Sequence, residues 1–214
     1  MDMEKTNTII TIGRQFGSAG REIGYKVAKD LGIKLYDKEM LARAAKESGL
    51  CEELFETHDE KPTNSFLYSL VMDTYSLGYS SGNYADMPIN HKVFLAQFDA
   101  IKKLASEGPC VMVGRCADYA LSEYKDCFSV FVHADTDWRI NRLSQKHNKT
   151  AKEAKDMINK TDKSRSSYYN YYTNKKWGAA SSYNLCVDSS KLGIDGAAKA
   201  IIQAIEIFDS IKNK

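Results

Sequence analysis

Short apolar runs alternate with longer amphipathic stretches along most of the chain. The apolar runs lie within residues 9–12, 110–113, 128–132 and 185–187, and a further short strand is expected at 34–37, where it ends in a carboxylate. Runs of this length bounded by turn residues are typical of buried strands, and the stretches between them have helical periodicity. Strand and helix therefore alternate about five times. This order predicts an α/β fold with a parallel sheet and helices on both of its faces.

Helix start and stop signals divide the stretches between the strands. We expect helices over residues 21–31, 38–48, 90–106, 117–121, 135–146 and from 195 onward. Asp135 and Asp195 are placed to cap two of these helices. Thr150 with Glu153 three residues later forms a capping box, which starts a helix in the charged tract 147–178. Few residues of this tract can be buried, so we expect an exposed helical hairpin.

Residues 50–90 have little periodicity and are rich in Tyr, Ser, Gly and Asn. We expect helical pieces joined by loops, inserted into the α/β domain. Four tyrosines of this insert are candidates for stacking on a nucleotide base: Tyr68, Tyr75, Tyr79 and Tyr84. Aromatic side chains also supply much of the area of cores and interfaces, so packing within the insert or against a partner subunit is the other interpretation.

Composition narrows the class of protein. The chain has 214 residues, of which 43% are apolar, and this suits one α/β domain with a core and an insert. Its 30 basic and 28 acidic residues leave a net charge of +2, so no overall field favours nucleic acid or an anionic membrane. The five cysteines lack C-x-x-C spacing, which favours reduced core thiols over disulfides or zinc. No secretory signal or membrane-length apolar run is present, and we expect a soluble, cytoplasmic protein.

The turn after the first strand is rich in small residues and precedes a cation. Gly13, Gly17, Ser18 and Gly20 lie between the strand and Arg21, which opens the first helix. Glycines let backbone N–H groups approach a phosphate, and the helix N-terminus adds unpaired donors and a partial positive charge. The stretch is therefore a candidate phosphate-binding loop.

The strict phosphate-loop pattern is G-x-x-x-x-G-K-[ST]. On that pattern Arg21 replaces the lysine, and Glu22 stands where a hydroxyl normally contacts magnesium. A Gly-rich turn is also a common tight connection, in which Arg21 and Glu22 would be solvated residues of the first helical turn. The loop pattern alone is compatible with a phosphate-binding loop and with a tight connection.

Charged residues follow several of the other predicted strands. Asp37, Gly114–Arg115, His133 and Asp188 end strands, as Gly13–Arg14 does. Ligands of parallel sheets bind beyond the carboxyl ends of the strands, so these residues predict a nucleotide site at one edge. Asp37 is equally well placed to cap the next helix. His133 has no feature of a catalytic base.

Five ordered motifs together resemble the cytidylate kinase-like family, within the phosphate-loop nucleoside monophosphate kinases. They are FGSAGREIG, LYDKEM, CVMVGRCADYAL, DKSRSSYYNYYTNKKWG and YNLCVDSSKLGID, and they extend over most of the chain. The resemblance implies a core of residues 5–49, 91–146 and 179–214. It also implies an acceptor-binding insert at about 50–90 and a lid at about 147–178.

The resemblance further implies roles for individual residues. Those expected to wrap the ATP phosphates are Gly17, Ser18, Ala19, Gly20, Arg21 and Glu22. Those expected at the acceptor are Arg14, Asp37, Arg115 and Asp118. Those expected on or near the lid are Arg139, Arg142, Lys160, Asp162 and Arg165. Arg21, Arg115 and Arg165 would be catalytic, and no side-chain metal ligand is expected.

The implied reaction is transfer of the γ-phosphoryl group of ATP, with Mg²⁺, to a nucleoside monophosphate, CMP or dCMP being the first guess. The expected partners are ATP and a small phosphorylated acceptor, and a homo-oligomer is possible. Two other functions are weighed: a kinase of a different small acceptor, and a regulatory nucleotide-binding protein with little catalysis. A dinucleotide-dependent oxidoreductase is disfavoured because the turn lacks G-x-G-x-x-G.

Overall fold

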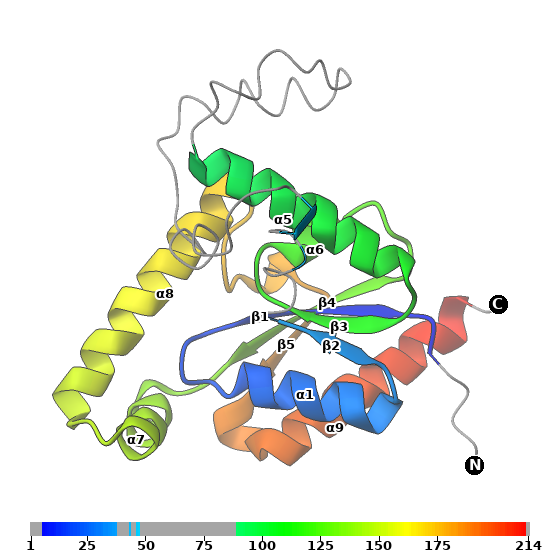
Figure 1. The fold of residues 1–214 in the computed structure, drawn as a ribbon. Helices are drawn as coiled ribbons and strands as arrows, with labels where there is room; N and C mark the ends of the chain where they lie inside the picture. The colour runs from blue at the N-terminus through cyan, green and yellow to red at the C-terminus, as the bar shows by residue number, and fades with distance from the viewer. Residues whose placement is uncertain (1–5, 38–42, 44–45, 48–88, 213–214) are drawn as a thin grey trace.

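A five-stranded parallel sheet forms the centre of the molecule. The computed structural model describes residues 6–37, 43, 46–47 and 89–212, and the elements named below belong to this part of the chain (Figure 1). The strands are β1 (Ile9–Arg14), β2 (Lys34–Tyr36), β3 (Cys110–Val113), β4 (Cys127–His133) and β5 (Leu185–Asp188). They pair in the order β2-β3-β1-β4-β5, and every pair is parallel. The predicted parallel sheet is confirmed.

Helices cover both faces of the sheet (Figure 1). They are α1 (Gly20–Leu31), α5 (Ile89–Ser106), α6 (Ala117–Ala120), α7 (Thr136–His147), α8 (Ala151–Thr173) and α9 (Ser189–Lys212), with a 3₁₀ turn η1 (Ala180–Ser182). Helices α1 and α9 lie on one face, and α5 and α6 lie on the other. The three-layer α/β fold expected from the alternation of strands and helices is therefore present.

The pleat of β1 explains why its sequence is apolar on both sides. Ile10 and Ile12 pack with Ile23 of α1 in one core cluster. Ile9 points the other way and packs with Ile101 of α5. Successive side chains of a strand point to opposite faces, so a strand covered on both faces is buried at consecutive positions. Thr11 interrupts the apolar residues of β1 and is itself buried.

The charged tract 147–178 differs from its prediction. It contains one long helix, α8, and not an exposed hairpin. Tyr168, Tyr169 and Tyr172 near its C-terminal end are buried, and the ring of Tyr172 stacks on Phe94 of α5 at a centroid distance of 3.9 Å. The tyrosines supply the apolar area that the charged composition of the tract concealed. They hold the end of α8 against the domain.

The start of α8 agrees with its prediction. The Thr150 hydroxyl accepts a hydrogen bond from the Glu153 N–H at 3.3 Å, and the Glu153 carboxylate accepts from the Thr150 N–H at 2.8 Å. These are the two reciprocal bonds of a capping box.

The cap expected from Asp135 is not formed by its side chain. Asp135 does occupy the position before α7, but its carboxylate makes no capping hydrogen bond. It forms an ion pair with Lys191, at 3.1 Å, near the start of α9.

The last helical stretch consists of two segments, and the second begins after Gly193, close to where the helix from residue 195 was expected. Helix α9 starts at Ser189, and its backbone is broken at Gly193, where φ is 67° and ψ is 177°. The Asp188 carboxylate accepts a hydrogen bond from the Ser190 N–H at 2.9 Å, so it satisfies the helix start. Asp195 lies beyond the break and forms an ion pair with Lys26 of α1 at 3.3 Å.

The four cysteines in the described residues are free thiols. Cys110 and Cys116 are buried, whereas Cys127 and Cys186 are partly exposed. Burial raises the pKa of the Cys110 and Cys127 thiols to about 12, so both stay protonated at neutral pH. This agrees with the expectation of reduced thiols for these four. Among the described helices, none is long and apolar enough to cross a membrane.

Two predictions concern residues that the structure does not describe. Residues 43, 46 and 47 are helical, as expected for 38–48, but the rest of that helix lies outside the described residues. The proposed insert at about 50–90 also lies outside them except for its last two residues, which begin α5. The base-stacking and packing interpretations of its tyrosines therefore both stand.

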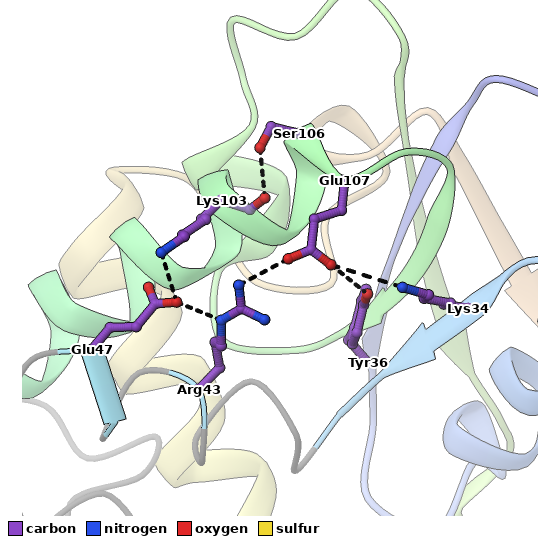
Figure 2. Close-up of polar contacts among 7 residues, drawn as sticks. All are labelled: Lys34, Tyr36, Arg43, Glu47, Lys103, Ser106 and Glu107. Carbon is purple, nitrogen blue, oxygen red and sulfur yellow. Dashed lines mark hydrogen bonds and ion pairs between the residues drawn. The ribbon is translucent and has the colours of Figure 1, made fainter.

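An ion-pair network joins Arg43 and Glu47 to the C-terminal end of α5 (Figure 2). Arg43 pairs with Glu107 at 2.9 Å and also with Glu47, which pairs with Lys103 at 3.0 Å. Glu107 additionally accepts a hydrogen bond from the Tyr36 hydroxyl at 3.4 Å. About a third of the Arg43 and Glu107 side chains is exposed, at 35% and 33%, so solvent screens these charges.

Glu107→Gln is expected to lower the free energy of unfolding by less than about 1 kcal/mol, because exposed ion pairs contribute little. Urea denaturation at two salt concentrations measures the loss, and Glu206→Gln on the exposed side of α9 is the matched control. A loss above about 2 kcal/mol would show that the network acts as a buried one and contradict this prediction.

Candidate active site

The loop between β1 and α1 has the shape of a phosphate cradle. Its backbone turns through the left-handed region at Gly17, where φ is 82°, and at Ala19, where φ is 60°. Ser18 is fully buried, and its hydroxyl lies 2.9 Å from the Gln15 carbonyl oxygen and 3.1 Å from that of Val132. The Ser18 side chain therefore fixes the shape of the loop. The Ser18 backbone is bonded as well, because the Ser18 N–H donates to the Gln15 carbonyl at 3.3 Å and the Ser18 carbonyl accepts from the Ser189 hydroxyl at 2.8 Å.

Gly20 is required by close approach of the chain to itself. A Cβ atom built on Gly20 would lie 2.6 Å from the Cβ of Arg14. Gly20 begins α1, and the first N–H groups of a helix have no acceptor within the helix. Gly20 thus allows the end of β1 to lie directly beside the N-terminus of α1. A helix N-terminus favours an anion.

Gly20→Ala is expected to lower the free energy of unfolding by about 1–3 kcal/mol, because the backbone at Arg14 must move to admit the methyl group. Gly196→Ala in α9 is the control, since its Cβ would meet only the Cβ of exposed Leu192, at 3.3 Å. Thermal and urea denaturation of both variants measure the difference. Equal stability of Gly20→Ala and the unmodified chain would contradict the close approach.

A cavity of about 830 Å³ opens above this loop. The expected site residues among its lining are Arg14, Gly17, Ala19, Gly20, Arg21, Glu22, Asp37, Arg115, Arg142 and Arg165. Its size falls in the range of small-molecule sites. A second cavity of about 20 Å³, large enough for a water molecule, shares Arg14, Arg115 and Arg165 with the first.

Two arginines meet one carboxylate at the wall of the large cavity. The Asp37 carboxylate lies 2.7 Å from Arg21 Nε and 3.1 Å from Arg115 Nη1. Arg115 and Asp37 are buried, with 4% and 9% of their side chains exposed, whereas 62% of the Arg21 side chain is exposed. Because β2 pairs with β3, the residues that follow these strands are neighbours. The predicted convergence of these strand ends is confirmed.

The backbone that carries Arg115 is unusual. Gly114, Arg115 and Cys116 all have positive φ angles, of 82°, 55° and 54°. Residues other than glycine rarely adopt this region, and each costs on the order of 1 kcal/mol or more. The turn aims the Arg115 guanidinium back along the sheet edge, where it donates to the Asp37 and Val113 carbonyl oxygens at 3.0 and 3.3 Å.

Helices α7 and α8 contact the β1–α1 loop through a second charged pair. The Asp162 carboxylate accepts a hydrogen bond from the Phe16 N–H at 2.7 Å and pairs with Arg139 Nη1 at 2.6 Å. Arg139 also donates to the Phe16 carbonyl at 3.3 Å. The Arg165 guanidinium lies over the Phe16 ring at 5.7 Å. Sequence reasoning missed Phe16; a bulky apolar residue among glycines is the one signal that could have indicated it.

Glu22 forms the third charged group at this site. Its carboxylate pairs with Arg142 at 2.5 Å and with Lys146 at 3.0 Å, both on α7. Burial by itself would raise the pKa of Glu22, but the hydrogen bonds and charges of Lys146 and Arg142 lower it overall. Glu22 is therefore ionised at neutral pH and already neutralised by two cations. This does not fit a role as a magnesium ligand, and the described residues contain no metal-binding group of three or more His, Cys, Asp or Glu side chains.

Five expected site residues do not line the large cavity: Ser18, Arg139 and Asp162, whose contacts are given above, and Asp118 and Lys160. Asp118 lines the small cavity, and its carboxylate accepts a hydrogen bond from the Tyr169 hydroxyl at 2.7 Å. Burial raises the pKa of Asp118. Lys160 is exposed on α8 and lines neither of these cavities. Asp118 and Lys160 remain predictions as ligand-binding residues.

The comparison with family models decides the relationship. The model of the cytidylate kinase-like family matches residues 9–191. The chain belongs to this family. The family resemblance inferred from the motifs is confirmed, and no curated protein sequence gives a significant match.

Solved structures agree with the family and identify the fold. An uncharacterized protein from Eubacterium ventriosum ATCC 27560 is 28% identical, with a TM-score of 0.68, covering 93% of this chain and 98% of that one. A shikimate kinase from Bacteroides thetaiotaomicron is 13% identical, with a TM-score of 0.53 and coverages of 93% and 98%. A gluconokinase from Sinorhizobium meliloti 1021 is 10% identical, with a TM-score of 0.53 and coverages of 98%. The fold is that of the phosphate-loop kinases, a group of phosphotransferases.

Proposed function

We propose that this member of the cytidylate kinase-like family transfers the γ-phosphoryl group of ATP to a nucleoside monophosphate, with CMP or dCMP the first acceptor to test. One observation carries the proposal: Arg21, Asp37 and Arg115 meet at the wall of the large cavity, directly beside the glycine-rich loop. Two cations and a carboxylate next to a phosphate cradle suit the alignment of two phosphorylated substrates.

The donor half of the site is the loop and the start of α1. The backbone of Gly17, Ser18, Ala19 and Gly20 surrounds the donor phosphates, and the exposed Arg21 side chain reaches the outer ones. Arg21 has the freedom to do so because most of its side chain is in solvent. Phosphoryl transfer needs positioning and charge neutralisation more than covalent chemistry, so these donors and cations perform most of the catalysis.

The acceptor half is the edge formed by β2 and β3. Arg115 and Arg14 hold the acceptor phosphate, and Asp37 keeps the Arg115 guanidinium in place through their ion pair. Arg165 lies in both cavities, so it is placed to contact the phosphoryl group as it passes between the two substrates. Asp118 is proposed to contribute to the acceptor side from the small cavity.

Magnesium enters this proposal as part of the MgATP substrate. It rests on phosphate oxygens and water, which magnesium commonly retains, because Glu22 is held by Arg142 and Lys146. Residues 147–178 are proposed to act as the lid, anchored to the loop by Asp162 and Arg139. The acceptor-binding role of residues 50–90, a cytoplasmic location and a homo-oligomeric state remain proposals from the sequence.

A coupled assay of ADP formation tests the proposal. MgATP is offered with CMP, dCMP, UMP, AMP and GMP in turn, and also with shikimate and gluconate, the substrates named for structures of the same fold. Acceptor-dependent ADP with one pyrimidine monophosphate is the expected result. If ADP forms with shikimate or gluconate and with no nucleoside monophosphate, the proposed kinase activity stands and the proposed acceptor is wrong. ATP binding without any acceptor-dependent turnover would favour the regulatory function, to which the replacement of the loop hydroxyl by Glu22 also points.

A further inference from the structure

Glu22 and two cations of α7 form a cluster to which the proposed transfer reaction assigns no catalytic role. Glu22 lies in the first turn of α1, and Arg142 and Lys146 lie one turn apart on α7. All three line the large cavity beside the loop. The cluster therefore stands at the site where the outer phosphates of the donor would enter.

The partners of the Glu22 carboxylate are those that a phosphate group takes. The carboxylate sits at a helix N-terminus, which favours anions, and it accepts charge-assisted hydrogen bonds from an arginine and a lysine. In the strict loop pattern, this position carries a hydroxyl that contacts magnesium. Here it carries a fixed negative charge beside the donor site.

We propose that Glu22 is an internal competitor for the donor phosphates and makes the site select magnesium-complexed over magnesium-free triphosphate. The inference rests on the proposed donor site. A triphosphate must take Arg142 and Lys146 from Glu22 and then lie next to the released carboxylate. Magnesium-free triphosphate carries more negative charge than its magnesium complex, so the carboxylate repels it more strongly. Glu22 thus imposes through charge a preference that a hydroxyl ligand would impose by coordination.

The surroundings of the cluster permit this exchange. The Glu22 side chain is 42% exposed and that of Lys146 is 56% exposed, so both can move into solvent. Arg142 is more buried, and its guanidinium lies over the Trp138 ring at 5.7 Å. This contact with Trp138 keeps Arg142 at the cavity when Glu22 leaves it. The cations then remain available to the incoming phosphates.

Isothermal titration calorimetry with ATP tests the proposal on the full chain. Binding is measured with EDTA and with excess magnesium, for the unmodified chain, Glu22→Gln, and the control Glu206→Gln on exposed α9 surface. We expect Glu22→Gln to lower the dissociation constant of magnesium-free ATP by about fivefold, the size of a partly screened charge interaction. The dissociation constant of MgATP should fall by less than about twofold. The control should change neither value, and circular dichroism melts check that each variant is folded.

A double-mutant cycle tests whether the effect passes through α7. The selectivity is the ratio of the dissociation constants of magnesium-free ATP and MgATP. In an Arg142→Ala/Lys146→Ala background, Glu22→Gln should change the logarithm of this ratio by less than about half as much, because the two cations that Glu22 binds are absent. The inference is overturned if Glu22→Gln weakens ATP binding, changes both forms of ATP equally, or acts undiminished without the α7 cations. If the folded, unmodified chain binds neither form of ATP, the proposed donor site itself fails, and this inference falls with it.

Discussion

Replacing Arg115 by alanine is expected to lower kcat/KM for the acceptor by about 10²–10³-fold, because a preorganised cation at the transferring phosphate is lost. The same change should lower the free energy of unfolding by about 1–3 kcal/mol, because the buried Asp37 loses one of its two arginine partners and keeps Arg21. Steady-state kinetics and urea denaturation measure the two effects separately.

Arg115→Lys separates charge from geometry. Lysine keeps the positive charge but loses the planar fork that reaches the carboxylate and carbonyl oxygens of Asp37, so an intermediate loss of activity is expected. Arg43→Ala removes an arginine from the exposed network in Figure 2 and is the control for loss of a cation alone. Full activity of a folded Arg115→Ala variant would contradict the assignment of this arginine.

Tyr172→Ala is expected to lower the free energy of unfolding by about 3–5 kcal/mol, as for other large buried aromatic residues. Tyr172 is 1% exposed and stacks on Phe94, and it also contacts the rings of Tyr168 and Tyr171. Losing it should loosen the C-terminal half of α8. Urea denaturation gives the loss, and hydrogen exchange of α8 should rise above that of α1.

Lys163→Ala is the control for Tyr172→Ala, because Lys163 lies on the exposed side of the same helix. It should change stability by less than about 0.5 kcal/mol. A loss below about 1 kcal/mol for Tyr172→Ala would mean that α8 is not anchored by its tyrosines, and the expected exposed arrangement of this tract would regain support.

The sequence predicted the sheet well because the central strands β1, β3 and β4 are largely buried. A continuous apolar run such as 110–113 is too short for a core helix when turn residues bound it, so it indicates a buried strand. The meeting of Asp37 and Arg115 was also predictable, since the carboxyl ends of parallel strands share one edge. The order of the strands in the sheet was not predictable, because the residue pattern of one strand does not identify the strands that pair with it.

The contacts of α7 and α8 could not be read from the sequence. Asp162 binds the Phe16 N–H across 146 positions of the chain, and Arg142 binds Glu22 across 120. Such pairs depend on how helices dock, and neither spacing nor composition records that. The same limit applies to Asp135: its position before α7 was correct, but Lys191, distant in sequence, takes its carboxylate.

Transfer of radiolabel from [γ-³²P]ATP is the measurement that tests the kinase proposal most directly. The chain is incubated with labelled MgATP and CMP or dCMP, and the nucleotides are separated from inorganic phosphate. We predict label in the β-position of the pyrimidine diphosphate, and its loss in Arg115→Ala. Label found only in inorganic phosphate, or retained in ATP with every nucleoside monophosphate, would contradict the proposed transfer.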